Sequence, residues 1–187
     1  MKVRRIQNGS ELYHHGVKGQ KWGVRNGPPY PITKISKKKD AKEVDEVYNT
    51  LTPKQKRQLQ GFDDNEKMPN ELKKHFVTQK DYDQSKVEHY VLKMKDVPIS
   101  VLDIWNEDED SAAVSIMTRN GPEYRNKGYA TKLVKEGLKW YEQSDIKNLY
   151  WDVRSDNEAS KNLAIKSGFK KDQNYKENGW ETYVKRK

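Results

Sequence analysis

Hydrophobic and polar residues follow two patterns along the chain, short apolar runs typical of strands and a three- to four-residue repeat typical of helices. Together these patterns predict an α/β fold. Short runs rich in apolar and β-branched residues predict strands at 87–94, 98–105, 112–118 and 148–153. Apolar residues that recur every three or four positions predict helices at 40–48, from about 127 to 142, and after Asn157. Thr52 followed by Pro53 is typical of a helix start and predicts another helix that continues to Leu59.

The order of these elements predicts one domain rather than two. Two strands joined by a tight turn at 95–97 precede a strand–helix–strand–helix series, and residues 169–173 and 180–184 form a final hairpin. A chain of 187 residues is long enough for a single α/β domain with an extension. Residues 61–86 are polar and show no clear period, so no element is predicted there.

All of the net charge lies in the first 39 residues. This segment holds ten Lys and Arg side chains against Glu11 alone, whereas residues 40–187 hold 27 basic and 27 acidic side chains. The segment is also rich in Gly, contains Pro28, Pro29 and Pro31, and shows neither pattern. The sequence therefore predicts a flexible basic arm over residues 1–39 and a folded domain over residues 40–187.

The composition excludes several classes of protein and of site. The chain has no Cys, so it forms no disulfide, no Cys-ligated zinc site and no thiol nucleophile. No apolar run approaches the roughly 18 residues of a membrane span, and no signal peptide is visible, so we expect a cytoplasmic protein with no membrane partner. His14 and His15 are adjacent in the arm, away from Cys or paired carboxylates, and we expect no metal there.

The residues from Arg125 to Ala130 carry the clearest chemical signal. They lie between the strand at 112–118 and the amphipathic helix, so they form a turn that opens a helix. Backbone N–H groups at such a helix end converge, and the helix dipole favours negative charge there. Gly128 has no Cβ and lets a bulky anion approach the backbone. The turn is thus predicted to bind the phosphates of a ligand.

The pattern of this turn, R-x-x-G-x-A, resembles the coenzyme A loop of the GNAT family of N-acetyltransferases. A second family element, N-x-x-[AS]-x-x-L-x-x-K-x-G-F, resembles residues 157–169. The matching residues are Asn157, Ser160, Leu163, Lys166, Gly168 and Phe169, and Val153 stands where the family places a valine in the preceding strand. Two elements in the family order indicate the GNAT fold, a mixed and mostly antiparallel sheet flanked by helices, over about residues 40–187.

The resemblance implies a binding site for acetyl-CoA as co-substrate. It implies that backbone groups at a strand end line the pantetheine arm, that the turn holds the pyrophosphate, and that the start of the second element lies beside the pantetheine or the reacting centre. The residues assigned in this way are Met117, Thr118, Arg125, Asn126, Lys127, Gly128, Tyr129, Ala130, Asn157 and Ser160. The link from Thr118 to Arg125 is longer than is usual in the family.

The sequence does not assign the catalytic residues. Many family members carry a tyrosine four residues before the Gly of the final G-F pair, where it protonates the leaving thiolate, and Ala164 stands at that position here. Tyr175 is an alternative acid, although its polar surroundings favour a surface role. Asp103, Glu123 and Asp152 are candidate bases, and for each of them we expect a solvated carboxylate on an exposed face.

Residues 11–25 of the arm resemble a short element, roughly Y-H-x-G-V-x-G-M-K-W-G-V-R, that recurs in proteins of phages and prophages of Gram-positive bacteria. Tyr13, Val17 and Trp22 are candidate anchors on a partner protein, and the basic residues between them suit an acidic surface. The resemblance implies a docking peptide for a phage structural protein. An unstructured basic extension that binds polyanions is the alternative.

We therefore expect an acetyl-CoA-dependent N-acetyltransferase, encoded by a phage or prophage, that acts on an amine acceptor in the cytoplasm of a bacterial host and associates with virions if the arm docks there. Polyamines, aminoglycosides, lysine side chains, protein N-termini and aminoacyl-tRNA all stay open as acceptors. The alternative function is a catalytically silent domain of the same fold, which binds a virion component or nucleic acid through its basic arm.

Overall fold

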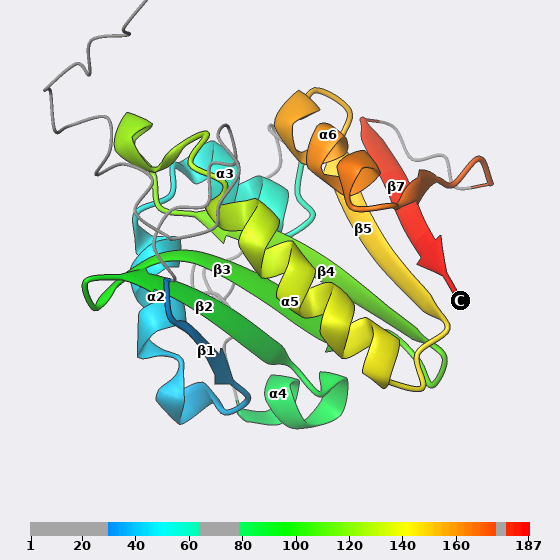
Figure 1. The fold of residues 1–187 in the computed structure, drawn as a ribbon. Helices are drawn as coiled ribbons and strands as arrows, with labels where there is room; N and C mark the ends of the chain where they lie inside the picture. The colour runs from blue at the N-terminus through cyan, green and yellow to red at the C-terminus, as the bar shows by residue number, and fades with distance from the viewer. Residues whose placement is uncertain (1–29, 64–78, 175–178) are drawn as a thin grey trace, which may run out of the picture. The chain divides into compact units, whose positions relative to one another are not determined.

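The structure is a computed structural model, and it describes residues 30–63, 79–174 and 179–187. The chain divides into two units, Met1–Tyr30 and Pro31–Lys187. The second unit contains all of the helices and strands that the structure describes (Figure 1). His14, His15, the docking element at 11–25 and Tyr175 lie outside the described residues.

The elements of the second unit follow the predicted order, with additions near the start. The strands are β1 (Ile32–Ile35), β2 (Glu88–Met94), β3 (Val97–Asn106), β4 (Ser111–Thr118), β5 (Asn148–Arg154), β6 (Lys170–Lys171) and β7 (Trp180–Arg186). The α-helices are α2 (Lys42–Asn49), α3 (Pro53–Leu59), α4 (Gln79–Ser85), α5 (Tyr129–Gln143) and α6 (Glu158–Lys166), and the short 3-10 helices are η1 (Lys38–Asp40) and η3 (Pro122–Tyr124).

The strands form one mixed sheet in the order β1-β2-β3-β4-β5-β7-β6. All neighbouring pairs are antiparallel except β4 and β5, which are parallel. The parallel pair arises because α5 carries the chain back from the end of β4 to the level at which β4 began. This topology confirms the predicted mixed, mostly antiparallel sheet.

Helices cover both faces of the sheet (Figure 1). On one face α5 packs across β2, β3 and β4, where its Gly137 lies so close to Leu102 that an added Cβ would come within 2.5 Å of the Leu102 side chain. On the opposite face α2 buries Val47 and Tyr48 in the same core cluster as Val101 of β3. Successive residues of β3 therefore face different helical layers, as the alternation of a strand requires.

The folded unit begins earlier in the chain than the sequence predicts. Residues Ile32–Ile35 form β1 and pair with β2 at the edge of the sheet, so the domain starts near Pro31 and not after Lys39. Four residues are too few to show an alternating pattern, and only Ile35 of this strand is buried. Contacts with β2, rather than local sequence, create this strand.

Left-handed residues set the ends of two elements. Lys95 and Asp96 have φ angles of 49° and 65°, so β2 and β3 are joined by a two-residue turn and not by the predicted turn at 95–97. Asn126 and Gly128 have φ angles of 57° and 78°, which keep the turn before α5 non-helical. For this reason α5 begins at Tyr129, two residues later than predicted.

The polar region 61–86 contains α4, which the sequence does not predict. Tyr82 is its one buried residue, and a single buried residue gives no helical period. Residues 64–78 of this region lie outside the described residues.

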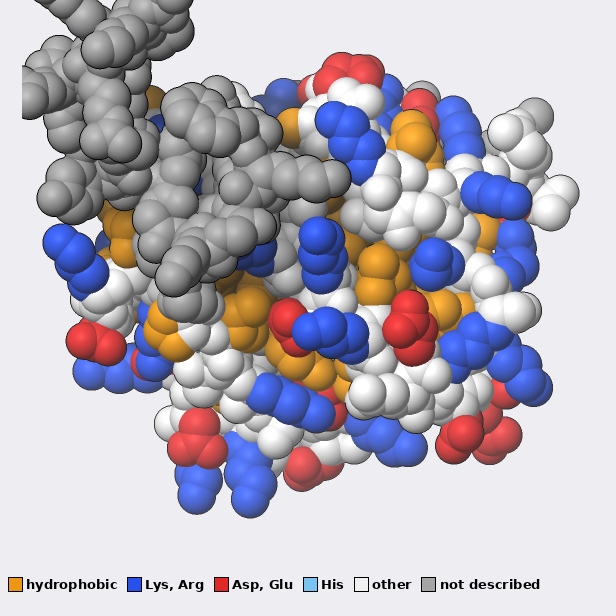
Figure 2. All heavy atoms as spheres, viewed as in Figure 1, with side chains coloured by type: hydrophobic (Ala, Val, Ile, Leu, Met, Phe, Trp, Pro, Cys, Tyr) orange, Lys and Arg blue, Asp and Glu red, His pale blue; other side chains and the backbone are white. Residues whose placement is uncertain are grey.

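The face that includes α5 carries Lys and Arg side chains interspersed with Asp and Glu (Figure 2). This mixture agrees with the equal numbers of basic and acidic side chains in residues 40–187. Within the described part of the chain, none of the helices has the length and apolar character that a membrane span needs.

Candidate active site

The sheet opens between β4 and β5. Their pairing covers three positions, from Ser111 opposite Asn148 to Ala113 opposite Tyr150. Beyond that point β4 continues beside β3, whereas β5 continues beside β7. The two strands diverge there, and the opening is part of a cleft with a volume of about 830 Å³.

The turn before α5 has the geometry expected of an anion site. Lys132 N–H donates to Gly128 O over 3.1 Å at the start of the helix, so the amides that precede it are directed out of the helix end. Among the described residues, no side chain caps this end, and the first turn contains no acidic residue. A Cβ added to Gly128 would meet none of the described atoms within 4 Å. As far as the described residues go, the positive end of the helix dipole is open to a large anion.

The predicted residues of this turn differ in what they can offer a ligand. Arg125, Asn126, Lys127 and Gly128 are exposed. Tyr129 is buried, and its hydroxyl donates to the sulfur of Met94 over 3.8 Å, so its side chain belongs to the core and its contribution is limited to the backbone. Ala130 is half-buried in the first turn of α5.

The cleft brings together the other predicted coenzyme residues. Met117 and Thr118 at the end of β4 line it, and so do Asn157 and Ser160 at the start of α6. The Asn157 side chain accepts a hydrogen bond from Ser160 N–H over 3.2 Å and thereby caps α6. The turn from Arg125 to Ala130 is not part of the cleft lining and lies instead at the end of α5.

Ser100 on β3 fixes the end of β4. Its hydroxyl donates to Met117 O over 2.7 Å and lies 2.8 Å from the hydroxyl oxygen of Thr118. Ser100 is fully buried, so these bonds are shielded from water. The backbone that borders the opening is therefore held in place from the side of β3.

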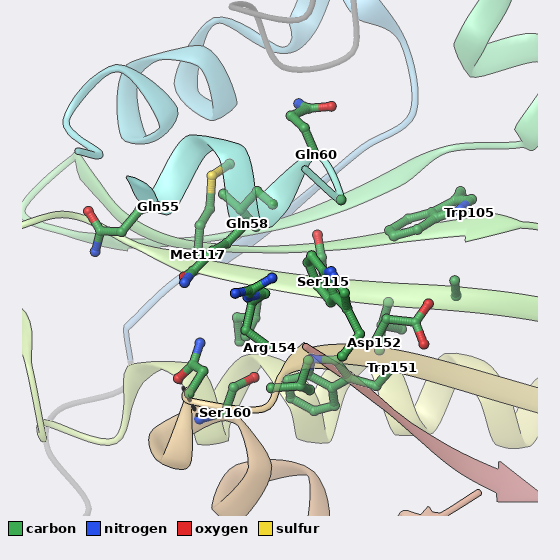
Figure 3. A pocket seen from close by; sticks show the side chains of 18 of the residues that line it. Gln55, Gln58, Gln60, Trp105, Ser115, Met117, Trp151, Asp152, Arg154 and Ser160 are labelled. Carbon is green, nitrogen blue, oxygen red and sulfur yellow. Dashed lines mark hydrogen bonds between the residues drawn. The ribbon is translucent and has the colours of Figure 1, made fainter. Parts of the chain in front are cut away.

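Side chains from α3 and β3 form another wall of the cleft (Figure 3). They include Gln55 and Gln58 of α3, Gln60 just after it, and Trp105 of β3. The start of α3 confirms the predicted cap, because Thr52 accepts from Gln55 N–H over 3.2 Å and the Gln55 side chain accepts from Thr52 N–H over 2.8 Å. Gln55 thus serves both the helix end and the cleft wall.

Charged side chains of β5 also face the cleft. Asp152 is exposed there, as the sequence predicts, and accepts a hydrogen bond from the Thr182 hydroxyl over 2.6 Å. The Arg154 guanidinium forms an ion pair with Asp63 and lies 5.4 Å from the centre of the Trp180 ring. Arg154 therefore ties the chain after α3 to β5.

Asp103 is not the solvated carboxylate that the sequence predicts. It is 0% exposed, because the alternation of β3 places it on the face that α2 and α4 cover. Its Oδ1 lies 2.6 Å from Nδ1 of His89, and its Oδ2 accepts a hydrogen bond from the Ser115 hydroxyl over 3.1 Å. Nε2 of His89 lies 2.6 Å from the Tyr82 hydroxyl oxygen. These four residues form a continuous polar network that ends at the cleft, where Ser115 is part of the lining.

The remaining candidate residues contribute less to the site. Glu123 lies on η3, is exposed and is not part of the cleft lining, so the structure does not place it with the other candidates. Ala164 on α6 is fully buried, and a methyl group at that position has no proton to donate.

Sequence reasoning missed the polar network because it depends on strand register. His89 lies opposite Asp103, and Asp103 lies opposite Ser115, in three successive strands. Register is set by packing and turn geometry and is not visible in one strand alone. The available signal was the presence of a polar residue at an inward position of each strand.

Comparison with known families and comparison with solved structures both lead to acetyltransferases. The family model described as "Acetyltransferase (GNAT) domain" matches residues 37–170. A search of curated proteins found no match.

Solved structures with a similar fold include the GNAT domain of S. lividans PAT, with 13% identity, a TM-score of 0.67, and coverage of 87% of this chain and 93% of that chain. The PaiA N-acetyltransferase from Thermoplasma acidophilum, solved in complex with coenzyme A, has 15% identity, a TM-score of 0.62, and coverage of 84% and 99%. An acetyltransferase from Streptococcus agalactiae has 12% identity, a TM-score of 0.61, and coverage of 83% and 98%. At these identities the likeness is one of fold.

Proposed function

Because the chain belongs to the GNAT family of acetyltransferases, we propose that it transfers an acetyl group from acetyl-CoA to an amine bound in the cleft beside β4, β5 and α3. Members of this family use acetyl-CoA, which supplies the acetyl group already activated as a thioester. The proposal rests on one combination of features, the uncapped, acid-free end of α5 together with the opening between β4 and β5. The first suits a diphosphate, and the second suits an acyl-bearing arm.

The described residues fit coenzyme A. Amides from Asn126 to Ala130 hold the pyrophosphate at the end of α5, and the exposed Arg125 and Lys127 add positive charge beside it. The main chain of Met117 and Thr118 borders the pantetheine arm along β4. Asn157 and Ser160 border the same opening from α6 and lie beside the pantetheine or the reacting centre.

The acceptor amine binds on the side of the cleft lined by side chains. Asp152 offers a carboxylate to a positively charged amine, and Trp105 offers an aromatic face. Holding the amine nitrogen next to the acyl carbon is the main source of rate acceleration in such a transfer. The amine must be neutral when it attacks, so a group near it has to accept a proton.

Calorimetry with acetyl-CoA tests the coenzyme site through a matched pair of variants. Gly128→Asp and Gly128→Asn have nearly the same size, and both new residues tolerate a φ of 78° better than most. We expect the unsubstituted chain to bind acetyl-CoA at micromolar concentration, Gly128→Asn to bind it more weakly, and Gly128→Asp to lose measurable binding because a carboxylate stands where the phosphates belong. Absence of binding by the unsubstituted chain, or equal losses in the two variants, would contradict the assignment.

Release of the coenzyme A thiol tests the transfer itself. We expect the unsubstituted chain to release thiol from acetyl-CoA in the presence of at least one amine among spermidine, tobramycin and a lysine-containing peptide. The amine that is turned over also identifies the acceptor class. Binding of acetyl-CoA without thiol release for any of these amines would favour the catalytically silent binding module.

We further propose that a phage or prophage encodes this chain and that residues 1–31 attach it to a structural protein of the virion. The proposal is supported by the element at 11–25 and by the concentration of basic residues in the arm. Deletion of residues 1–31 keeps all of β1 (Ile32–Ile35) and removes the hydrogen bond that Pro31 O accepts from Lys93 N–H at the sheet edge, so acetyl-CoA binding is expected to stay the same while association with virions is lost. Unchanged association would contradict docking, and binding to DNA that weakens steeply with salt would indicate a polyanion-binding arm instead.

A further inference from the structure

We propose that Ser115 is the catalytic residue that accepts the proton of the acceptor amine, and that Asp103, His89 and Tyr82 behind it position it and store that proton. The inference rests on the proposed function, since it concerns the same transfer. Ser115 lines the cleft and lies two residues beyond Ala113, the last residue of β4 that pairs with β5. Its hydroxyl therefore stands just inside the opening of the sheet (Figure 3).

With Asp103 ionised and His89 neutral, as the proposal has them, the direction of the network follows from hydrogen-bond chemistry. A carboxylate only accepts hydrogen bonds, so His89 Nδ1–H and the Ser115 hydroxyl both donate to Asp103, over 2.6 and 3.1 Å. His89 Nε2 then accepts from the Tyr82 hydroxyl over 2.6 Å. Asp103 thus holds at least one donor on each oxygen, which orients the Ser115 hydroxyl toward it and leaves a Ser115 lone pair for the cleft.

The far end of the network is buried. Tyr82, His89 and Asp103 are 2%, 0% and 0% exposed, so of the four residues Ser115 is the one that a molecule in the cleft can reach. One hydroxyl can then serve as the base when the amine attacks and as the acid when the thiol leaves. The second role is the one that Ala164, a buried methyl group, cannot perform.

The charged groups around the network keep Tyr82 in its protonated form. Burial raises the pKa of Tyr82, and nearby carboxylates raise the pKa further. These carboxylates are Asp103, Asp45 of α2, whose partner Lys38 lies 3.1 Å away, and Asp81 of α4, while Asp152 of β5 lines the cleft beyond Ser115. Tyr82 therefore acts as a fixed donor to His89, and the proton is stored on the side of Asp103.

The proton steps balance. Ser115 takes one proton from the attacking nitrogen while its own hydroxyl proton passes to Asp103, so the network gains one proton and loses its negative charge. The new bond from nitrogen to carbon replaces the bond from carbon to sulfur, whose electron pair leaves with the sulfur. Ser115 then gives a proton to the sulfur and recovers one from Asp103. One amine proton has moved to the thiol, and the protein has regained its first state.

A first experiment reads the network without an acceptor. Nitrogen NMR of the histidine side chains of the full chain, with coenzyme A present, reports which ring nitrogen of His89 carries the proton, and His89→Gln assigns the signal. We expect the proton on Nδ1 in the unsubstituted chain, and a change in the His89 signal in Asp103→Asn. A proton on Nε2 with Nδ1 unprotonated would overturn the proposal, since Nδ1 would then have nothing to donate to Asp103.

A second experiment uses the amine found by thiol release. We expect Ser115→Ala and Asp103→Asn each to lower kcat about 100-fold, with the KM for the amine and the Kd for acetyl-CoA unchanged. We expect the double variant to be no slower than Ser115→Ala alone, because both residues act in the same step. Losses that multiply in the double variant, or a Ser115→Ala variant with near-normal kcat, would overturn the proposal.

Tyr141→Phe is the matched control for Tyr82→Phe. The Tyr141 hydroxyl is also buried and hydrogen-bonded, to Lys147 O over 2.6 Å and to Lys185 O over 3.1 Å, but it belongs to α5 on the other face of the sheet. Both variants are expected to be less stable, whereas Tyr82→Phe alone lowers kcat and shifts the acid side of its pH profile. Equal kinetic effects would overturn the proposal. If the unsubstituted chain releases no thiol at all, the proposed function fails, and the NMR measurement still decides the network.

Discussion

The two binding regions that we propose are built from different parts of the chain. As proposed, the coenzyme side uses main-chain atoms, those of the end of β4 in the cleft lining and those of the turn at 126–130, which lies outside that lining. The acceptor side uses side chains that four elements bring together, such as Gln58 of α3, Trp105 of β3, Ser115 of β4 and Asp152 of β5. A main-chain site depends on local backbone conformation, which a short motif can record. A side-chain site depends on how distant elements pack, which no short motif records.

The comparison leads to opposite expectations for the two sides. Changes of side chain that leave the backbone in place should disturb the acceptor side and spare coenzyme binding. Changes that move α5 should weaken coenzyme binding and leave the acceptor side undisturbed. Each of the following predictions is tested by measuring acetyl-CoA affinity, acceptor kinetics or stability. These measurements distinguish an effect on the coenzyme side from an effect on the acceptor side.

The largest effect is expected for Asp152→Asn. Loss of the carboxylate removes attraction worth about 1 to 4 kcal/mol to an ammonium group at about 4 Å, so kcat/KM for the acceptor should fall at least about fivefold. The Kd for acetyl-CoA, measured by calorimetry, should stay the same. The control is Asp172→Asn, since Asp172 is paired with Arg186 at 2.8 Å and does not line the cleft. An equal loss in both variants would show that the cleft carboxylate has no special role.

Gly137→Ala should act on the coenzyme side. An added Cβ would lie 2.5 Å from Leu102 and 3.4 Å from Ile104, and because both side chains are buried we expect α5 to shift. Overpacking costs about 1–3 kcal/mol, and the better helix propensity of Ala offsets up to about 1 kcal/mol of it. Urea unfolding should therefore show a loss of about 1–2 kcal/mol, together with weaker acetyl-CoA binding and an unchanged acceptor KM.

Lys139→Ala is the control for Gly137→Ala on the same helix. Lys139 is exposed and pairs with Glu136 at 2.8 Å, and such surface pairs contribute about 1 kcal/mol or less. A Gly137→Ala variant as stable as this control would mean that the Leu102 side chain rotates away and that α5 stays in place.

Thr52→Ala should act on the acceptor side with a smaller effect. It removes the oxygen that caps α3, and loss of such a cap costs about 1 kcal/mol. The wall that carries Gln55 and Gln58 should become less ordered, which raises the acceptor KM and leaves the Kd for acetyl-CoA unchanged. Thr52→Ser keeps the cap and is expected to behave like the unsubstituted chain.

Alkaline pH should destabilise the fold through two buried tyrosines, Tyr82 of α4 and Tyr183 of β7. Burial raises the pKa of Tyr82 on one face, and it raises the pKa of Tyr183 in β7 to about 12, with help from the hydrogen bond to Glu181. The unfolded chain loses these protons near pH 10, about the usual tyrosine pKa, so the stabilisation is complete below that pH and declines as the pH rises further. Denaturant unfolding should show this decline, with a smaller slope in Tyr82→Phe. An unchanged slope would contradict the assignment of Tyr82.

The elements that the sequence predicts correctly are those whose signals are local. The Thr52 cap involves residues within a few positions of one another, and the turn that contains Gly128 directly precedes the helix that it opens. The central strands are also predicted, because their apolar runs are long enough to be read alone. By contrast, β1 and α4 bury a single residue each and are formed by contacts with the rest of the sheet. Such tertiary effects outweigh local propensity.

Within the candidate site, too, residues in short motifs are predicted and residues brought together by tertiary packing are not. The turn at 125–130 and the residues Asn157 and Ser160 are assigned from the sequence because the family resemblance lies in short motifs. Asp103 was expected in solvent and is buried instead, because helices cover the face of β3 on which it lies. Its partners His89 and Ser115 become neighbours only through the register of three strands.

The short pairing of β4 and β5 also bears on how the protein avoids aggregation. Strand edges that lack a neighbour usually recruit strands of other molecules. Where β4 and β5 part, their edges face each other inside the molecule, with α3 against β4 and α6 against β5. Because the two edges face each other and a helix packs beside each, we expect neither to pair readily with a strand of a second copy. The same parting of strands that forms the cleft would then add no exposed edge to the outside of the sheet.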